Sequence, residues 1–355
     1  MAKNIVMCLD GTGNQLKAKG NTNVVRLYDM LALHDPTSQV AFYDPGVGTF
    51  GAQGAVTPIA RGFTRVLGLA VGYGLRTNLA DAYTYLMNTY EPGDQIYVFG
   101  FSRGAYTARA LCGMLNLAGL LRPGAENLVP YAIKVYARSK KEWSDADWDQ
   151  INKFADVFAV DEGHSRAVPI HFLGIWDSVK AAGLLRWSVH WPYTRKLPNV
   201  ATARHAVSID EKRRPYHEYL VEPDGPTPEL REVWFAGVHS DVGGTFDDDP
   251  RLADITLKWM TDHAIDAGLH LKADTYQTTC ALTVDHAQGR VHRMGWIWAL
   301  LTYRRRTVTP QGAFVHESVK LRMAQNPWYR PKGADTVSWD DPHWLTPRPL
   351  DHESP

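Results

Sequence analysis

The sequence predicts an α/β fold in three layers, with a mostly parallel central sheet between helices and an inserted helical cap. Two observations predict it. Short apolar segments that are typical of buried strands alternate with longer segments of helical periodicity, which is the pattern of a parallel sheet with helices on both faces. In addition, residues 95–109 (QIYVFGFSRGAYTAR) lead from an apolar strand through a G-x-S-x-G motif directly into a helix-forming sequence.

The N-terminal half alternates strand and helix in short units. Its strands are apolar and end at turns rich in glycine, proline or aspartate, and its helices show helical periodicity. The expected elements are a strand at 4–9, a helical segment at 23–34, a strand at 39–43, a glycine-rich loop and helix within 50–74, a helix at 75–90, and the strand and helix of residues 95–109.

The C-terminal half is expected to complete the same domain. Residues 123–166 are charged and helical, which predicts the inserted cap, and the tail at 326–355, rich in Pro, Trp and Asp, is expected to wrap the surface. No internal repeat or low-complexity linker divides the chain, so we expect one domain over residues 1–325. Between cap and tail, the sequence predicts strands at 168–176 and 232–238 and a helix at 252–267.

Composition excludes some classes of protein. Lys plus Arg and Asp plus Glu both number 38 in the 355 residues, so the chain lacks the basic excess of a general nucleic-acid binder. The three cysteines (Cys8, Cys112 and Cys280) form no metal or disulfide pattern, which favours a reducing compartment. The N-terminus enters a strand without a secretory signal, and no run approaches the ~20 apolar residues of a membrane span. We therefore expect a protein that is cytoplasmic as synthesised.

Ser102, at the centre of G-x-S-x-G, is the candidate nucleophile. A sharp turn from strand to helix would present its hydroxyl at the carboxyl edge of the sheet, and a side chain at Gly100 or Gly104 would clash in so tight a turn. The N-terminus of the following helix would direct its N–H groups toward an anion forming at the serine. The motif alone is weak, but the strand before it and the helix after it supply the context that it requires.

A serine nucleophile needs a base to take its proton, and the base needs a carboxylate to orient it. In open α/β sheets such groups lie at the carboxyl ends of strands. Asp177 and His239 each come directly after an apolar run, and the order Ser, Asp, His along the chain is that of α/β-hydrolases. His316 remains an alternative base, and Asp241 or Asp210 remains an alternative orienting carboxylate.

The turn at residues 10–14 (DGTGN) follows the first strand and is the candidate oxyanion hole. Glycines leave backbone N–H groups accessible, and such groups stabilise the anion of a tetrahedral intermediate. A phosphate cradle is the alternative, but the turn lacks the spacing and the lysine of a P-loop, and Asp10 would repel a phosphate. The candidate donors are the backbone N–H groups of Gly11, Thr12, Gly13 and Arg103.

Several motifs occur together and in a fixed order. They are DGTGN at 10–14, YDPGVGT at 43–49, GFSRGAYTAR at 100–109, FLGIWD at 172–177 and GVHSDVGG at 237–244, with SIDEKR at 208–213 and VHESV at 315–319 as further matching segments. The set resembles the DUF2235 family, the α/β-hydrolase domain of Tle1-type phospholipase effectors of type VI secretion. The resemblance covers roughly residues 3–320.

This resemblance implies an α/β-hydrolase-like fold and hydrolysis of carboxylic esters, with Ser102 as nucleophile and with Asp177 and His239 in the positions of acid and base. The attested substrates of the effector branch are glycerophospholipids, and many relatives are bacterial hydrolases. The chemistry needs no metal and no organic cofactor. Because the chain is much shorter than the large effectors, the resemblance leaves open an exported toxin or an intracellular enzyme.

One segment has the composition of a membrane-surface element. GWIWALLTY at 295–303 is followed by three arginines at 304–306, and aromatic rings beside basic side chains suit a lipid interface. A core helix with a solvated basic end, or a lid over an acyl pocket, would give the same pattern. We therefore expect an ester or lipid substrate and a peripheral membrane contact. The alternative function is a non-catalytic module that binds a phosphate-bearing ligand through the 10–14 turn and these arginines.

Overall fold

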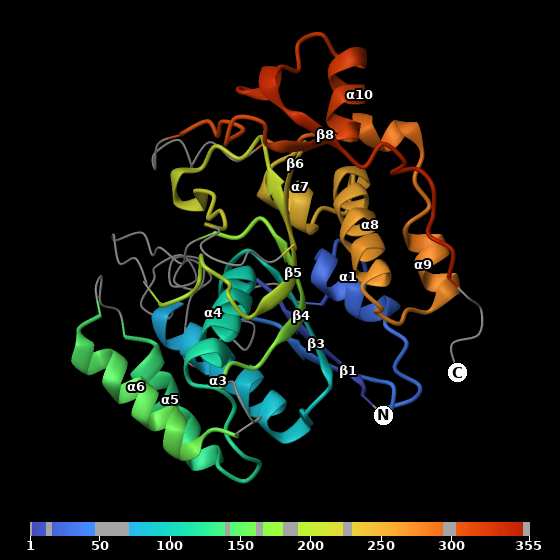
Figure 1. Cartoon of the computed structure of the whole chain (residues 1–355). Coiled ribbons are helices and arrows are strands. Elements are labelled where there is room, and N and C mark those ends of the chain that lie inside the picture. Colours follow the sequence, from blue (N-terminus) through green and yellow to red (C-terminus); the bar gives the residue numbers. More distant parts are fainter. Residues whose placement is uncertain are drawn as a thin grey trace, which may run out of the picture.

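The chain is described by a computed structural model that covers residues 2–11, 16–46, 71–138, 143–160, 166–179, 191–222, 229–293 and 303–350. Its centre is a sheet with the strand order β2-β1-β3-β4-β5-β6-β7-β8, and every neighbouring pair is parallel (Figure 1). The expected parallel α/β fold is therefore confirmed. The strands are β1 (Asn4–Leu9), β2 (Gln39–Asp44), β3 (Gln95–Phe101), β4 (Ile170–Trp176), β5 (Val200–Ser208), β6 (Glu229–Phe235), β7 (Phe314–His316) and β8 (Ser338–Asp340).

Helices cover both faces of the sheet, which gives the expected three layers (Figure 1). α3 and α4 pack on one face, and α1 and α8 pack on the other. The helices are α1 (Asn23–Met30), α3 (Val71–Thr89), α4 (Arg103–Leu117), α5 (Val129–Tyr136), α6 (Asp145–Phe158), α7 (His239–Gly243), α8 (Arg251–Asp266), α9 (Ala273–Thr279) and α10 (Glu317–Gln325), and the 3-10 turns are η1 (Glu126–Leu128), η2 (Arg214–Tyr216), η3 (Val284–Gln288) and η5 (Ala334–Thr336).

The central strands are buried on both faces, so their side chains alternate between two cores. In β1, Ile5 and Met7 belong to the core beneath α3 and α4, whereas Val6 and Cys8 belong to the core beneath α1 and α8. All four side chains are fully buried. Burying an aliphatic side chain of this size contributes about 1.5–3 kcal/mol to the free energy of folding. This burial stabilises β1 although the strand is short.

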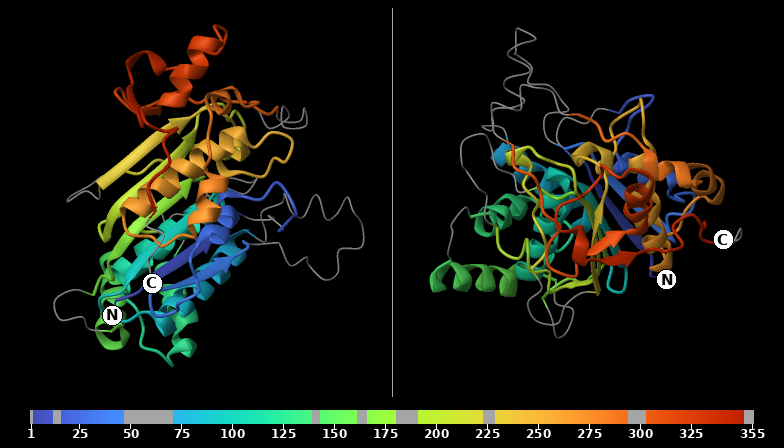
Figure 2. Two further views of the ribbon diagram at one scale, coloured as in Figure 1. Left: turned by 90° about the vertical axis from the view of Figure 1, so that its right-hand side faces the viewer. Right: turned by 90° about the horizontal axis from the view of Figure 1, so that it is seen from above.

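The inserted segment expected at residues 123–166 contains α5 and α6. Both helices lie on the outer side of α3 and α4, at the opposite end of the molecule from α10 (Figure 1, Figure 2). The N-cap of α6 is Ser144, whose backbone N–H donates to the Asp147 carboxylate over 3.0 Å. This reciprocal cap at the first turn satisfies N–H groups that have no acceptor within the helix.

The predicted strands do not include β5. Its sequence is VATARHAVS, and Arg204 and His205 interrupt the apolar run. Both residues are buried nonetheless, because Arg204 pairs with Glu229 at 2.7 Å and His205 pairs with Glu232 at 2.7 Å on the neighbouring strand β6. Because polar side chains on these adjacent strands pair with one another, a search for apolar residues does not find this strand.

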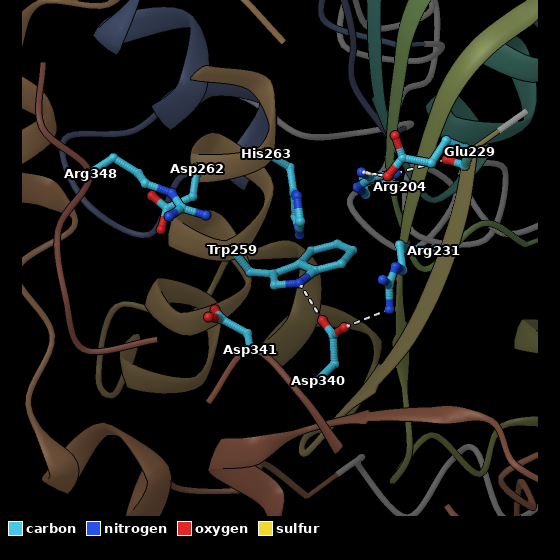
Figure 3. Close-up of a pocket in the computed structure, with 9 residues that line it drawn as sticks. All are labelled: Arg204, Glu229, Arg231, Trp259, Asp262, His263, Asp340, Asp341 and Arg348. Carbon is cyan, nitrogen blue, oxygen red and sulfur yellow. Dashed lines mark hydrogen bonds and ion pairs between the residues drawn. The ribbon is translucent and has the colours of Figure 1, made fainter. Parts of the chain in front are cut away.

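The segment after residue 326, expected to wrap the surface, also adds β8 to the sheet. Asp340 at the end of β8 accepts hydrogen bonds from Trp259 in α8 (3.0 Å) and from Arg231 in β6 (3.4 Å), as Figure 3 shows. A cavity of about 210 Å³ lies among these side chains. Its charged groups are engaged in ion pairs, among them the Arg204–Glu229 pair, so the cluster fastens β8 to α8 and β6.

The segment predicted to contact a membrane lies largely outside the described residues, which resume at Tyr303. Within the described ranges, no helix is both long enough and apolar enough to cross a bilayer. The three arginines that follow the segment are described, and they do not form a single solvated cluster. Arg304 and Arg305 are exposed, whereas Arg306 is buried.

Candidate active site

Ser102 occupies the turn between β3 and α4, with φ 59° and ψ −118°. This backbone conformation is strained for a residue with a side chain, and such strain clusters at functional sites. The flanking glycines make the turn possible. A Cβ at Gly104 would lie 2.1 Å from the carbonyl oxygen of Leu9, and one at Gly100 would lie 2.7 Å from the carbonyl oxygen of Gly104. The turn has the geometry expected of a nucleophile elbow.

Asp177 follows β4, the strand beside β3. The two strands are in register at Phe101 and Trp176, and the Ser102 N–H donates to the Trp176 carbonyl over 3.1 Å. The next residue of each strand is therefore delivered to the same carboxyl edge of the sheet. Asp177 itself has a positive φ of 37° and is fully buried.

His239 reaches the same edge from β6. It is the first residue of α7, and its ring packs against the Phe101 ring at 4.6 Å and edge-on to the Tyr216 ring at 4.9 Å. Nδ1 of His239 lies 2.6 Å from Oδ2 of Asp177. The structure therefore joins the predicted base to the predicted carboxylate, and it places the residue before Ser102 in contact with the imidazole.

Arg306 is the second partner of Asp177, and its role was not predicted. Its guanidinium donates from Nη1 to Oδ1 at 2.6 Å and from Nη2 to Oδ2 at 3.1 Å. Nη1 also donates to the carbonyl and the hydroxyl of Ser208, and Nη2 donates to the carbonyl of Tyr216. The expectation that Arg306 belongs to a phosphate-binding or membrane-facing cluster is therefore wrong, because its side chain is buried against the carboxylate.

These contacts set the charge states of the pair. Burial alone would raise the pKa of the Asp177 carboxyl, but the Arg306 guanidinium and the hydrogen bond with His239 outweigh burial and hold that pKa well below its usual range. Burial lowers the pKa of the His239 imidazole, and the Asp177 hydrogen bond opposes only part of that effect. At neutral pH the pair is therefore a carboxylate beside a neutral imidazole, which is the state that a general base requires.

A second set of contacts holds His239 from its backbone side. The His239 N–H donates to Glu211 over 3.2 Å, and Glu211 forms an ion pair with Arg213 at 2.8 Å. The Arg213 guanidinium stacks on the Tyr216 ring at 3.7 Å, and that ring in turn packs against His239. The sequence analysis named Glu211 and Arg213 only as part of a matching segment, so these contacts come from the structure.

The turn that carries Asp177 is fixed by a buried histidine. The Ser178 N–H donates to Nε2 of His205 over 3.2 Å, and Nδ1 of His205 lies 2.7 Å from Glu232. An imidazole that accepts at Nε2 donates its one proton from Nδ1, so His205 is neutral in this arrangement. Burial lowers the pKa of His205, which favours the same state.

The alternative residues lie in other networks. Asp241 accepts hydrogen bonds from the Val238 N–H (2.9 Å) and from Nδ1 of His292 (2.5 Å). Asp210 accepts from the Gly237 N–H and from the Tyr329 hydroxyl, each at 2.8 Å. Neither aspartate is hydrogen-bonded to the His239 imidazole in the described structure, and each instead accepts a backbone N–H from the loop before His239.

His316, the alternative base, is fully buried at the end of β7. Its Nδ1 lies 2.8 Å from the Ser318 hydroxyl, its ring stacks on Phe235 at 4.7 Å, and its Nε2 lies 3.5 Å from Asp341. These contacts cap α10 and join it to β8. The structure therefore does not bring His316 to Asp177.

The predicted oxyanion turn is described up to Gly11. Thr12 and Gly13 lie outside the described residues. The Gly11 N–H donates to the Asp10 carboxylate over 2.6 Å, and that carboxylate also accepts from the hydroxyls of Thr22 (2.6 Å) and Tyr43 (3.0 Å). The Gly11 N–H thus has a carboxylate acceptor in this structure, and the roles of Gly11, Thr12 and Gly13 as oxyanion donors stay predictions.

The sequence of residues 3–263 matches a family model described as the catalytic domain of Tle1-like phospholipase effectors of the type VI secretion system. The chain belongs to this family. The matched range of the Tle1-like domain includes Ser102, Asp177 and His239 and ends before Arg306.

A curated relative of this Tle1-like chain is an uncharacterized protein of Saccharomyces cerevisiae, which is 35% identical over 233 residues. The alignment covers 64% of this chain and 34% of the yeast protein, so the chain spans about a third of the length of that relative. The resemblance seen in the sequence pointed to bacterial relatives, whereas this relative is from yeast and argues against a purely bacterial distribution.

Two solved structures are similar to the chain at low identity. One is the crystal structure of an uncharacterized protein from Pseudomonas aeruginosa, with a TM-score of 0.45 and 20% identity, covering 80% of this chain and 48% of that one. The other is the Tle1 effector bound to the VgrG spike of the type 6 secretion system, with a TM-score of 0.36 and 18% identity, covering 69% of this chain and 51% of that one.

Proposed function

We propose that the chain hydrolyses carboxylic esters of lipids, with Ser102 as nucleophile, His239 as general base and acid, and Asp177 as the orienting carboxylate. The observation that carries this proposal is the 2.6 Å contact between His239 and Asp177 at the sheet edge where Ser102 occupies a strained turn. A structural Gly-Ser turn has no need of a buried imidazole and carboxylate beside it.

The reaction follows from the orientation of the imidazole. Because Nδ1–H of His239 is donated to Asp177, Nε2 carries the lone pair that takes the proton of Ser102. The serine oxygen then attacks the ester carbonyl carbon, and His239 returns the proton to the leaving alcohol. The acyl group remains on the serine until water, deprotonated by the same imidazole, releases the acid and restores the hydroxyl.

The developing oxyanion is assigned to the N-terminus of α4. Arg103 is the first residue of that helix, and its N–H is the proposed donor, supported by the positive end of the helix dipole. A donor of this kind acts on charge that appears only in the transition state, which is why it raises kcat rather than only affinity.

The family description supports phospholipids as the esters, which makes the reaction phospholipase A-like. The alternative, a non-catalytic module that binds a phosphate-bearing ligand, relied on the 10–14 turn and on three arginines. One of these arginines, Arg306, is engaged with Asp177, and the carboxylate of Asp10, the first residue of the 10–14 segment, accepts the Gly11 N–H. Both observations favour the enzyme.

Hydrolysis of p-nitrophenyl butyrate tests the proposal. The wild type is expected to turn the ester over, and Ser102→Ala is expected to lower kcat by ~10³-fold or more. Ser338→Ala, on the exposed side of β8, is the matched control and should retain full activity. Equal rates for wild type and Ser102→Ala would exclude Ser102 as the nucleophile. A second assay, which measures fatty-acid release from phosphatidylcholine micelles by the wild type, establishes whether the protein hydrolyses phospholipid esters.

A further inference from the structure

Trp328 is the most exposed large apolar side chain of the described residues, with 94% of its surface accessible. It lies in the turn that follows α10, at the end of the molecule where α10 and β8 lie (Figure 1, Figure 2). An indole of this size is among the costliest side chains to leave in water. Such exposure therefore needs an explanation.

The turn that presents Trp328 is firmly built. The Trp328 N–H donates to the Asn326 side chain over 3.1 Å, and the Tyr329 N–H donates to the Asn326 carbonyl over 3.0 Å. The guanidinium of Arg330 donates to the carbonyls of Met323 (3.1 Å) and Tyr329 (2.9 Å). Hydrogen bonds within the turn therefore fix the backbone that exposes the Trp328 indole to solvent.

The same turn is fastened to the loop that carries His239. The Tyr329 hydroxyl donates to Oδ2 of Asp210 over 2.8 Å, and the same oxygen accepts the Gly237 N–H at 2.8 Å. Gly237 lies two residues before His239 in the chain. Trp328 is therefore connected to the proposed active site through two hydrogen bonds.

Three segments meet at this place. Arg304 N–H donates to the Lys212 carbonyl over 2.8 Å, and Val308 N–H donates to the Lys332 carbonyl over 2.9 Å, so residues 303–308 join the 210–214 segment to the Trp328 turn. Tyr303, beside Arg304, is 46% exposed. The exposed basic side chains of these segments, here called the basic face, are Lys212, Arg214, Arg304, Arg305, Arg330 and Lys332.

Negative charge on the same segments is neutralised internally. Asp210 is bonded to Gly237 and Tyr329, and Glu211 is paired with Arg213. The basic face therefore presents positive charge and exposed aromatic rings together. Negatively charged lipid surfaces attract clusters of Lys and Arg, and Trp and Tyr rings settle at the level of the head groups.

We propose that the basic face binds the surface of a bilayer that contains anionic lipids, with Trp328 seated among the head groups. The inference deepens the proposed function, because it names the surface from which the enzyme would take its lipid substrate. An acidic protein partner would use the charges as well, but an exposed indole on segments that also carry exposed cations matches a lipid interface, where apolar depth and anionic charge occur together.

Co-sedimentation with vesicles tests the proposal on the full chain. Vesicles of phosphatidylcholine alone are compared with vesicles that contain phosphatidylglycerol, at low and at high salt. The wild type is expected to bind the anionic vesicles ~10-fold more strongly, and to lose that preference at high salt because the charges are screened. Trp328→Ala and the double variant Arg304→Glu/Arg305→Glu are each expected to lower vesicle binding ~5-fold or more.

Matched controls come from the opposite end of the molecule. Tyr131 on α5 is 44% exposed, so Tyr131→Ala removes an exposed ring elsewhere, and Lys134→Glu/Lys153→Glu reverses two exposed charges on α5 and α6. Both control variants are expected to bind vesicles within twofold of the wild type. Equal loss in the control and test variants would overturn the proposal, since it would show that any exposed ring or cation suffices.

Failure of this inference differs from failure of the proposed function. A wild type that hydrolyses p-nitrophenyl butyrate but binds neither kind of vesicle, or a Trp328→Ala variant that binds like wild type, would overturn the inference alone. The protein could instead lack esterase activity and still bind vesicles in a way that depends on salt and on Trp328. That result would support lipid binding by the basic face and contradict the proposed ester hydrolysis. Trp328→Ala is expected to keep full activity on the soluble ester.

Discussion

Nη1 of Arg306 lies 2.6 Å from Oδ1 of Asp177, the carboxylate whose other oxygen contacts Nδ1 of His239 at 2.6 Å. A carboxylate held by a permanent cation stays ionised and keeps one orientation. The same cation offsets part of the negative charge that would otherwise raise the pKa of the imidazole. In the proposed mechanism Arg306 is therefore a positioning residue, which acts on His239 through Asp177.

Replacing Arg306 with Gln removes the cation and keeps an amide in its place. We expect the free energy of unfolding to fall by about 3–5 kcal/mol, because a buried carboxylate loses its ion-pair partner. We also expect kcat on the soluble ester to fall ~10–100-fold, as Asp177 loses its fixed orientation. The pKa of His239 should rise, so the acid limb of the kcat/KM profile moves to higher pH.

Arg306→Lys keeps the positive charge but loses the two-pronged geometry of the guanidinium. We expect this variant to keep the acid limb of the kcat/KM profile near that of the wild type and to recover only part of kcat. Arg304→Gln, which replaces an exposed arginine two residues earlier, is the control and should leave kcat and the acid limb of the pH profile unchanged. If folded Arg306→Gln shows the wild-type pH profile, Arg306 has only a structural role.

The wild-type pH profile is itself a test of the site. His239 must be neutral to accept the serine proton, and burial lowers its pKa from the ordinary value of 6.5. Activity should therefore be complete at neutral pH and fall as the pH drops through the lowered pKa of His239. The measurement is kcat/KM for the soluble ester between about pH 4 and 8. Half-maximal activity at or above pH 6.5 would contradict the assignment.

Substitution of the two candidate histidines gives opposite results. His239→Ala should lower kcat by ~10³-fold or more with a small change in stability, because it removes the base. His316→Ala should keep kcat within a few-fold but lower the free energy of unfolding by about 1–3 kcal/mol, because it removes a buried ring stacked on Phe235 and the cap of α10. Turnover that survives His239→Ala but not His316→Ala would reverse the assignment.

The elbow glycine provides a test of geometry. Gly104→Ala would place a methyl group 2.1 Å from the Leu9 carbonyl oxygen, so β1 and α4 must separate. We expect a loss of stability of about 3 kcal/mol or more and loss of esterase activity. Gly93→Ala is the control, since its Cβ meets nothing within 4 Å and costs only the strain of a positive φ, about 1 kcal/mol. Equal thermal stability of both variants would contradict the close approach.

The sequence predicts much of this site because its members follow a local rule. Ser102, Asp177 and His239 each come directly after an apolar run, and parallel strands that end in register deliver such residues to one edge. That rule needs no knowledge of distant contacts. It also explains why Asp177 and His239 lie in contact although they are 62 positions apart in the chain.

The contacts that were missed depend on distant parts of the chain. Arg306 is separated from Asp177 by 129 positions, and its neighbours Arg304 and Arg305 give it the pattern of a solvated cluster. β5 was missed because Arg204 and His205 are buried only through partners on β6. A polar or charged side chain is buried where a partner from another part of the chain pairs with it. Because that partner is distant in the sequence, no local pattern identifies the buried residue.

The position of Arg306 also has a consequence for the order of synthesis. The family-matched region ends at residue 263, so a ribosome has already made the serine, the aspartate and the histidine before it reaches the arginine that balances the aspartate. Until then the Asp177 carboxylate lacks the hydrogen bonds and the positive charge of that guanidinium. In the proposed lipase, full activity therefore depends on a side chain that lies outside the family-matched region and that is made after the serine, the aspartate and the histidine.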